Sequence, residues 1–254
     1  MRKKSFHYLS VVVSAILLVA MVAAWAPAKK VSAASNSVSI SGSYTTSNGS
    51  IWIYERSEYT TNYTLNVHVT GIKASDTVYV HVHKFNQSFD KNRPLVSGTS
   101  YSNYVDLHAT VNSSGYACTS GFWQVDVEVR NNNTSYFLSP FYFYVVKSNA
   151  VNFMNTLLNY EHSLNFVLGA ASLSQGGSAC NVVRSYLPNF SNKSNREYVI
   201  LLYQRVLGRY PGSAEVDWWV GQLNSGKKTR KQVLDDFVYS PEFKGRCGNM
   251  NLVW

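Results

Sequence analysis

The sequence predicts an α+β protein of two domains, an N-terminal antiparallel β-sandwich followed by a small all-α helical bundle. Residues 35–147 alternate between polar and apolar side chains with a period of two, and turn-forming clusters separate the alternating runs. After Lys147 the apolar residues recur with a period of about 3.6, which is typical of amphipathic helices. We therefore expect a β-sandwich at 35–147, a helical spacer at 148–193 and a helical domain at 194–254.

Residues 1–33 have the features of a signal peptide. Three basic residues, Arg2 to Lys4, precede an apolar run from Leu9 to Ala26, and Val31-Ser32-Ala33 offers small side chains for cleavage after Ala33. The alternative is an uncleaved anchor, because the apolar run is long for a signal peptide. We expect a protein that is secreted or held at the cell surface, and that contacts the membrane only if this segment stays uncleaved.

The net charge of +9 comes largely from that segment, which holds five basic residues and no acidic ones. Its removal leaves 18 basic and 14 acidic residues, a net charge of +4. This small excess of mixed charges is a weak electrostatic footprint, so we expect no nucleic acid as a partner. Hydrophobic residues make up 45% of the chain and charged residues 15%, which argues against a disordered chain.

Seven short strands are predicted in the first domain. The clearest alternation lies at 64–69, 77–83 and 124–130, and further strands are expected near 38–44, 50–55, 104–111 and 137–146. The turn clusters between them lie at 47–49, 71–76, 112–115 and 131–134. So many short strands with no helical stretch favour two packed sheets.

The last two predicted strands resemble the closing hairpin of an immunoglobulin-like domain. Gly121-Phe122-Trp123 begins one strand, an Asn-rich turn follows, and 139–145 returns. The resemblance implies the architecture only, because the Cys…Trp…Cys spacing of antibody domains is absent.

Helix-capping signals are strong after residue 193. Ser194 with Glu197, and Thr229 with Gln232, have the spacing of a capping box, in which the cap side chain accepts from a first-turn N–H and the third residue reaches back. Gly208 fits the left-handed residue that closes a helix. Two further caps are expected at Ser213 and at Ser240, which is followed by Pro241.

The C-terminal domain resembles a known bacterial module. Its landmarks are Tyr198-Val199, Leu202-Tyr203, Val206-Leu207-Gly208-Arg209, Pro211, Trp219, Leu223, Gly226, Val233, Phe237 and Ser240-Pro241-Glu242-Phe243. This order is similar to the domain of unknown function family 4214 and, more distantly, to the linker domain of phycobilisomes. The family has no agreed activity, so the resemblance implies no catalytic residue.

Two positions depart from that family pattern. An Asp common after the Pro is Gly212 here, and a later Gly is Glu215. We expect Arg209 to bind backbone carbonyls or to pair with an acid such as Glu242, rather than to bind a ligand. Because family copies often occur in tandem, residues 150–190 are either a degenerate copy or a spacer, and the missing landmarks favour a spacer.

Four histidines are predicted on the outward faces of the strands: His68, His81, His83 and His108. If the strands of His68 and His81 formed a hairpin, His68, His81 and His83 would lie in one patch and could bind a transition metal. The alternative is that polar strand faces simply tolerate histidine.

Aromatic residues of the strands are candidates for stacking on sugar rings, with Trp52, Tyr54 and Tyr79 preferred. Tyr59, Tyr63, Tyr101 and Tyr104 are further candidates, and the alternative is that such residues build the core. Of the three cysteines, Cys180 and Cys247 are the preferred disulfide pair and Cys118 the spare, the alternative being three free thiols.

No motif of a hydrolytic enzyme is visible, neither a Gly-x-Ser-x-Gly elbow nor a His-Glu-x-x-His helix. We therefore expect a bacterial, exported, non-catalytic protein without a cofactor, which binds or assembles with a surface protein or glycan. The alternative is a carbohydrate- or metal-binding accessory module of an extracellular enzyme system.

Overall fold

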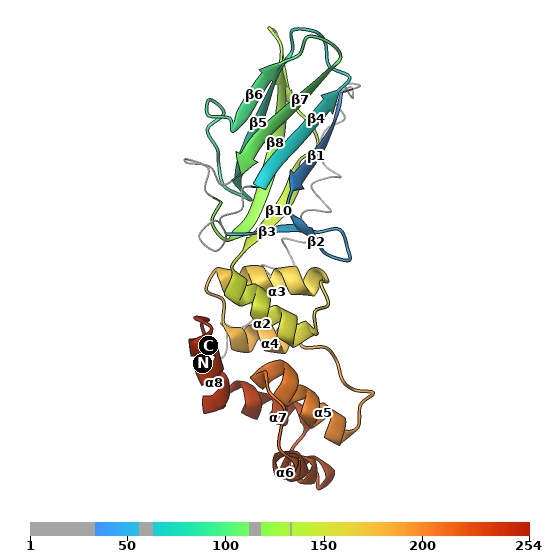
Figure 1. Cartoon of the computed structure of the whole chain (residues 1–254), viewed down its shortest axis with the longest axis vertical. Coiled ribbons are helices and arrows are strands. Elements are labelled where there is room, and N and C mark those ends of the chain that lie inside the picture. The colour runs from blue at the N-terminus through green and yellow to red at the C-terminus, as the bar shows by residue number, and fades with distance from the viewer. Residues whose placement is uncertain (1–33, 56–62, 112–117, 133) are drawn as a thin grey trace, which may run out of the picture. The chain divides into compact units, whose positions relative to one another are not determined.

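The computed structural model describes residues 34–55, 63–111, 118–132 and 134–254. The predicted signal peptide, the candidate Tyr59 and the predicted turn at 112–115 lie outside these residues. Ser35–Trp254 forms one compact unit. The described chain is α+β, with strands in its N-terminal part and helices in its C-terminal part, as predicted (Figure 1).

The smaller sheet has three antiparallel strands in the order β1-β4-β7. The strands are β1 (Ser35–Ser41), β4 (Tyr63–Thr70) and β7 (Tyr104–Val111). Burial along β4 alternates strictly, with Leu65, Val67 and Val69 buried and the residues between them half-buried or exposed. This confirms the period of two that the sequence shows there.

The larger sheet has the strand order β2-β3-β10-β8-β5-β6, and β9 also pairs with β8. Its pairs are antiparallel except for β3 and β10, which are parallel, so the prediction of purely antiparallel strands is wrong at this one pair. The strands are β2 (Tyr44–Thr45), β3 (Ile51–Tyr54), β5 (Thr77–Lys84), β6 (Val96–Thr99), β8 (Gly121–Arg130), β9 (Ser135–Phe137) and β10 (Phe141–Val146).

Valines form the buried face of the central strands of this sheet. In β8 the residues Val125, Val127 and Val129 are fully buried, and in β5 Val78 and Val80 are as well. β-branched side chains suit this position because they pack well on a pleated surface. The residues between these valines point to the opposite face, which is the face on which the charged and imidazole groups of β5 and β8 meet.

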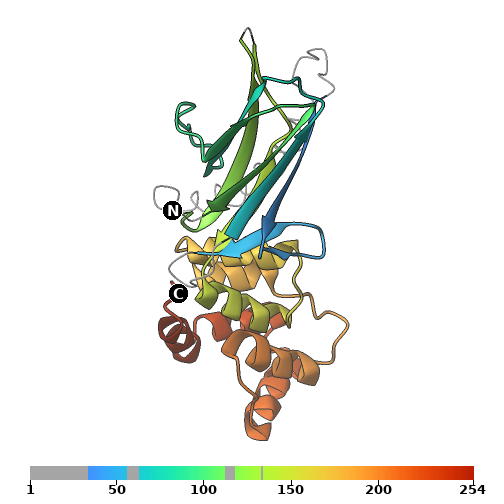
Figure 2. The same ribbon diagram turned by 45° about the horizontal axis from the view of Figure 1, so that its top comes forward.

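Seven α-helices and one π-helical turn follow the strands in the described residues (Figure 2). The first three are α2 (Ser148–Leu158), α3 (Leu164–Ser174) and α4 (Ala179–Tyr186). The others are α5 (Asn195–Leu202), the π-helical η1 (Tyr203–Leu207), α6 (Ser213–Asn224), α7 (Arg230–Val238) and α8 (Pro241–Asn249). No helix among the described residues is both long and apolar enough to cross a bilayer.

The helix caps follow the sequence signals closely. Both predicted capping boxes form, at Ser194 with Glu197 and at Thr229 with Gln232, and Ser240 caps α8 ahead of Pro241. One cap differs from the prediction. The N-cap of α6 is Gly212 rather than Ser213, and the Glu215 carboxylate accepts the Gly212 N–H at 2.7 Å.

The end of η1 depends on two residues that lie far apart in the sequence. Gly208 has a left-handed φ of +73°, as its predicted role requires. The guanidinium of Arg246 in α8 donates to the carbonyl oxygens of Arg205 and Val206, which an ending helix leaves without partners. A β-carbon at Gly208 would lie 3.0 Å from the Arg246 guanidinium carbon, so glycine also makes room for this contact.

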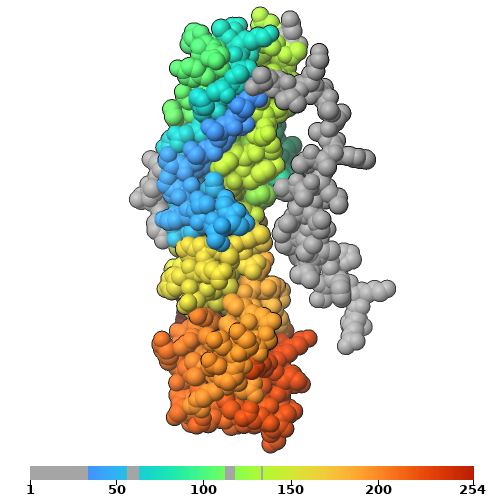
Figure 3. Space-filling view, turned by 90° about the vertical axis from the view of Figure 1, so that its right-hand side faces the viewer, coloured from blue at the N-terminus to red at the C-terminus, as the bar shows by residue number. Residues whose placement is uncertain are grey.

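One apolar core joins the helices to strands β3 and β10. Trp52 of β3 and Val146 of β10 belong to the same buried cluster as the inward-facing residues of α2 to α8. The Trp52 ring lies 5.5 Å from Phe166 of α3 and stacks at 4.4 Å on Tyr44. Figure 3 shows the blue surface of the first strands directly against the yellow surface of the helices that follow. The packing therefore crosses the predicted boundary at 147/148, and the predicted spacer helices share the core of the C-terminal helices.

The last residues pack back onto the helices. The Ala179 N–H at the start of α4 donates to the Val253 carbonyl at 2.7 Å, and the indole N–H of Trp254 donates to the Val238 carbonyl at 2.8 Å. The side-chain amide of Asn149 in α2 donates to the Met250 carbonyl at 2.8 Å. This segment thus ties α2, α4 and α7 together.

Candidate binding surfaces

A histidine–carboxylate cluster occupies the polar face of β5 and β8. His81 Nε2 lies 3.3 Å from the Glu128 carboxylate, to which Arg130 donates at 2.7 Å. The Ser135 hydroxyl of β9 donates to the other oxygen of Glu128. His81 and Glu128 are 1% and 2% exposed. The four groups therefore form an internal network, in which the buried Nδ1 atom of His81 has no hydrogen-bond partner among the described residues.

A second pair lies beside it under the ring of Phe89. His83 Nε2 lies 2.7 Å from the Asp126 carboxylate. The Phe89 ring covers both imidazoles, at centroid distances of 4.8 Å from His81 and 4.5 Å from His83. Covering the sheet face in this way shields the polar groups of the two strands from solvent.

The cluster shifts the acid–base properties of its members. Burial lowers the pKa of His81, and the hydrogen bond and charge of Glu128 offset this only in part. Burial by itself raises the pKa of Glu128, but the hydrogen bonds from Arg130 and Ser135 outweigh it and hold the pKa at about 2. His81 is therefore a neutral ring beside an ionised carboxylate at neutral pH.

The strand pairing overturns the arrangement behind the predicted metal patch. β4, which carries His68, pairs with β1 and β7, whereas β5, which carries His81 and His83, pairs with β6 and β8. His68 instead pairs with Asp106 at 2.6 Å on the smaller sheet. His81 lies on the polar face of its strand as predicted, but that face is covered there and the His81 side chain is only 1% exposed. Among the described residues no group of three potential ligands is placed to hold a metal.

The preferred sugar-stacking residues are covered to different degrees. Trp52 is 1% exposed, so its ring is part of the core and not a platform for a ligand. Tyr54 and Tyr79 are half-buried, and Tyr79 lies under the Arg130 guanidinium at 4.2 Å. Of the further candidates, Tyr63 is buried, whereas Tyr101 and Tyr104 are exposed.

The cysteines are buried as free thiols. The Cys180 thiol donates to the Val238 carbonyl at 3.2 Å. Burial raises the pKa of Cys247 to about 11, and the neighbouring Cys180 adds to this. High thiol pKa values make both groups weak nucleophiles. The structure gives Cys180 and Cys247 as thiols and therefore lends no support to the predicted disulfide between them.

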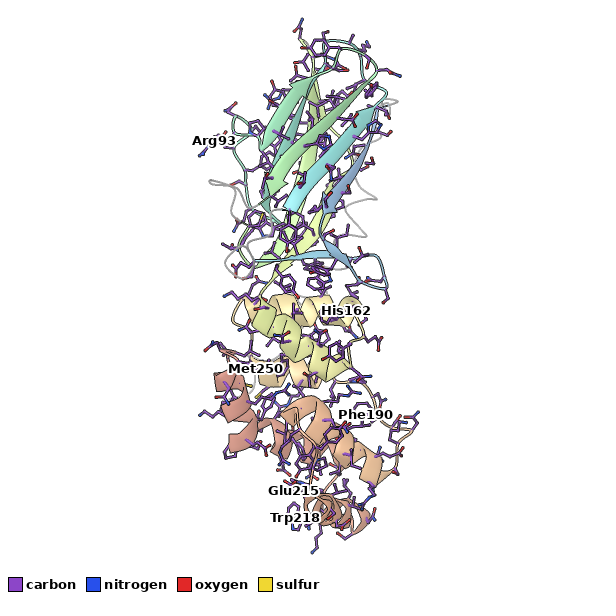
Figure 4. All side chains as sticks on the ribbon, viewed as in Figure 1. Arg93, His162, Phe190, Glu215, Trp218 and Met250 are labelled. Carbon is purple, nitrogen blue, oxygen red and sulfur yellow. The ribbon has the colours of Figure 1, made fainter. Side chains whose placement is uncertain are left out.

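Arg209 joins two helix N-termini. Its guanidinium makes paired hydrogen bonds to Glu215 of α6, at 2.7 and 3.0 Å, and to Glu242 of α8, at 2.5 and 3.1 Å. The contact with Glu242 is the one predicted from the sequence. Hydrogen bonds from Arg209 and from the Gly212 N–H hold the pKa of Glu215 at about 2. Glu215, labelled in Figure 4, thereby supplies the cap that Gly212 lacks a side chain to make.

A cleft of about 500 Å³ lies between the end of β3, the start of α2, the end of α3 and the last residues of the chain. Its polar groups are mostly engaged by the protein. Glu55 accepts the Ser120 N–H at 3.0 Å, Asn149 donates to the Met250 carbonyl, and the Ser174 hydroxyl donates to the Ala170 carbonyl. These groups are better placed to hold the chain together than to bind a ligand.

The exposed aromatic rings of the helical part are better placed for binding, and no sequence pattern pointed to them. Tyr239 is 56% exposed and Trp254 is 38% exposed, and their rings meet edge to face at 6.0 Å. The Arg184 guanidinium lies over Tyr239 at 4.6 Å and the Lys244 ammonium over Trp254 at 4.8 Å. We call Arg184, Tyr239, Trp254 and Lys244 the aromatic row. It brings together α4, the end of α7, α8 and the last residue, which only the tertiary structure makes neighbours.

Residues 185–247 match the family model described as Domain of unknown function (DUF4214). The match confirms the C-terminal resemblance to family 4214, and it runs from the end of α4 through α5, η1, α6 and α7 to most of α8. Searches of the curated proteins and of the solved structures found no significant match to this chain.

Proposed function

We propose that this chain is an exported, non-catalytic protein that binds or assembles with a surface protein or glycan, at the cell surface or in the medium. The observation that carries the proposal is the aromatic row, in which two rings stand exposed with a cation over each. Exposed aromatic rings with polar tips suit stacking on sugars and contacts at interfaces. The N-terminal segment, Arg2 to Ala33, supports export.

The proposal assigns no catalytic role because the ionisable groups with the closest geometry are already paired with one another. His81 and Glu128 form one such set, and Arg209, Glu215 and Glu242 form the other. Each group serves as a partner that stabilises the fold.

We infer that the strands form an immunoglobulin-like β-sandwich that carries the helical domain. Two rows of buried aliphatic residues support this, one along β4 of the smaller sheet and one along β8 of the larger sheet. A sheet with one apolar face needs a second layer against it. We also infer that the helices form a bundle with a distant likeness to the phycobilisome linker domain.

Two measurements test the proposal. Cells are separated into membrane, wall and medium, and the N-terminus of the product is sequenced. We expect the protein in the wall or medium with a terminus at Ala34. In parallel, the purified chain is incubated with insoluble polysaccharides and with cell-surface protein fractions. A product confined to the cytoplasm, or failure to bind either class, contradicts the proposal.

The alternative is a carbohydrate-binding accessory module of an extracellular enzyme system. The same aromatic row favours it, since such a module needs only a stacking surface. Co-purification from the culture medium distinguishes the two, because an accessory module is recovered with a secreted polysaccharide-degrading activity.

A further inference from the structure

We propose that the aromatic row, Arg184, Tyr239, Trp254 and Lys244, is a binding site for an anionic polysaccharide. This rests on the proposed function and narrows it from a protein or glycan to one chemical class. The site differs from the sugar-stacking residues predicted in the strands, since Trp52 is buried and Tyr79 is half-buried, whereas Tyr239 and Trp254 are exposed.

Both rings are held in place before any ligand arrives. The indole N–H of Trp254 donates to the Val238 carbonyl at 2.8 Å, and the Tyr239 hydroxyl accepts from Arg184 at 2.9 Å. A preorganised ring loses little conformational entropy when a ligand stacks on it. With a cation over each ring, Tyr239 and Trp254 are still 56% and 38% exposed, and aromatic surface that reaches solvent suits the apolar side of a pyranose.

The charges of the row favour an anionic ligand over a neutral one. Arg184 is paired with Asp235 at 2.7 Å, so its charge is largely compensated. Lys244 has no carboxylate within ion-pair distance in the part of the chain that the structure describes. Its ammonium lies 4.8 Å from the centre of the Trp254 ring. A sugar stacked on Trp254 therefore places a carboxylate or phosphate substituent beside an uncompensated positive charge.

Residues 194–254 contain nine basic and six acidic residues, an excess that is too small to attract a polyanion by itself. The selectivity for an anionic ligand therefore depends on Lys244, and salt should screen it. The aromatic row thus combines aromatic surface for stacking with the positive charge of Lys244, which favours anionic ligands over neutral ones.

The chain offers a matched control on α6. Trp218 is 55% exposed and is labelled in Figure 4. Its ring meets Trp219 edge to face, and its neighbour Asp217 is paired with Arg196. No cation lies over the Trp218 ring among the described residues. It is therefore an aromatic residue of similar exposure without the charge that we propose to be selective.

Affinity electrophoresis of the full chain tests the proposal, with polygalacturonate as the anionic probe and dextran as the neutral probe. We expect polygalacturonate alone to retard the protein, and added salt to weaken the retardation. Lys244→Gln should weaken binding about fivefold, because it removes one exposed charge interaction. Tyr239→Ala should weaken it about tenfold, because it removes a stacking ring. Trp218→Ala should leave it unchanged.

A phosphate-bearing polysaccharide in a third gel distinguishes phosphate from carboxylate as the favoured anionic group. Thermal unfolding of each variant checks that the fold is retained, and Lys244→Gln alters only an exposed side chain. Equal retardation by dextran overturns the proposal and leaves glycan binding intact. Loss of binding in Trp218→Ala but not in Tyr239→Ala also overturns it, and moves the site to α6. If no polysaccharide retards the chain, the proposal fails, and the protein fractions alone decide the proposed function.

Discussion

The strands and the helices place their charged side chains in opposite ways. On the polar face of β5 and β8, Glu128 is buried beside His81 under Phe89. In the helical part, the carboxylates that bind Arg209 are about two-fifths exposed. A strand pattern shows only which side chains share a face, and whether that face meets water depends on what covers it. A helix cap joins residues three positions apart in the chain, so the sequence alone predicts that its charged group lies at a helix end.

Trp52→Ala should have the largest effect, a loss of about 3–5 kcal/mol in the free energy of unfolding. Trp52 belongs to the core that strands β3 and β10 share with the helices. Loss of the ring should therefore lower the unfolding midpoint seen by far-UV circular dichroism for strands and helices together. Separate transitions, with the helical one unchanged, would show that the two regions are independent.

Trp52→Phe is the matched control for that variant. The indole N–H of Trp52 is buried and has no hydrogen-bond partner among the described residues. Phenylalanine keeps most of the apolar volume and removes the unsatisfied donor, so the loss should be much smaller than for alanine.

Glu128→Ala should cost about 3 kcal/mol, because it leaves His81 and Arg130 without their shared acceptor. Chemical denaturation measures the change. Asp106→Ala is the comparison on the smaller sheet, where the pair with His68 is half-exposed and worth at most about 1 kcal/mol. Equal losses in the two variants would show that burial under Phe89 is not what makes the network important.

Acidification should destabilise the folded protein in two steps, first through His81 and then through Glu128. The pKa of His81 is lower in the folded protein than the usual 6.5, so the unfolded chain binds more protons below that value. The free energy of unfolding should fall as the pH drops below about 6.5, by at most about 1.4 kcal/mol per pH unit for one proton. His81→Phe should flatten this part of the pH profile. The stability due to Glu128 is lost only as the pH falls from about 4.5 toward 2.

Gly208→Ala should cost about 1–2 kcal/mol, because its left-handed φ of +73° disfavours a β-carbon. The new methyl would also press on the Arg246 guanidinium. Gly221 in α6 is the control, since nothing lies within 4 Å of its β-carbon position. Gly221→Ala should instead stabilise the protein by about 0.5–1 kcal/mol. A loss at both glycines would contradict the special role of Gly208.

Thr229→Ala should have the smallest effect, about 1 kcal/mol, because it removes one side of the capping box at the start of α7. Thr229→Ser keeps the hydroxyl and should behave as the unmodified protein does. Hydrogen exchange of the first α7 amides measures the effect locally. Unchanged exchange in the alanine variant would show that packing alone holds this helix end.

Much of the fold could be predicted from the sequence. The strands end and the helices begin near Lys147, as the change of period indicates, because side-chain periodicity follows directly from backbone geometry. Both capping boxes, the Ser240 cap and the role of Gly208 were predictable because each involves residues close together in the chain. The contact of Arg209 with Glu242 was one of two predicted roles, because an arginine just after a helix end can pair with an acid or bind backbone carbonyls.

The candidate site was less predictable because it depends on which strands pair and what covers them. His68 and His81 lie on consecutive strands, and their alternation allows a hairpin as readily as two separate sheets. Trp52 and Tyr239 are equally aromatic in the sequence, yet one is buried by α3 and the other is exposed beside Arg184. Long-range packing makes that difference, and one-dimensional patterns do not record it.

By itself, the sequence determined where strands give way to helices, where most helices start, and which family the last helices resemble, because these properties depend on residues within a turn or two of one another. The tertiary structure alone decided the sheet order, the burial of the His81–Glu128 network and the assembly of the aromatic row. Each of these brings together segments separated by tens of residues, and the free energy that selects them comes from burial shared among all the contacting elements.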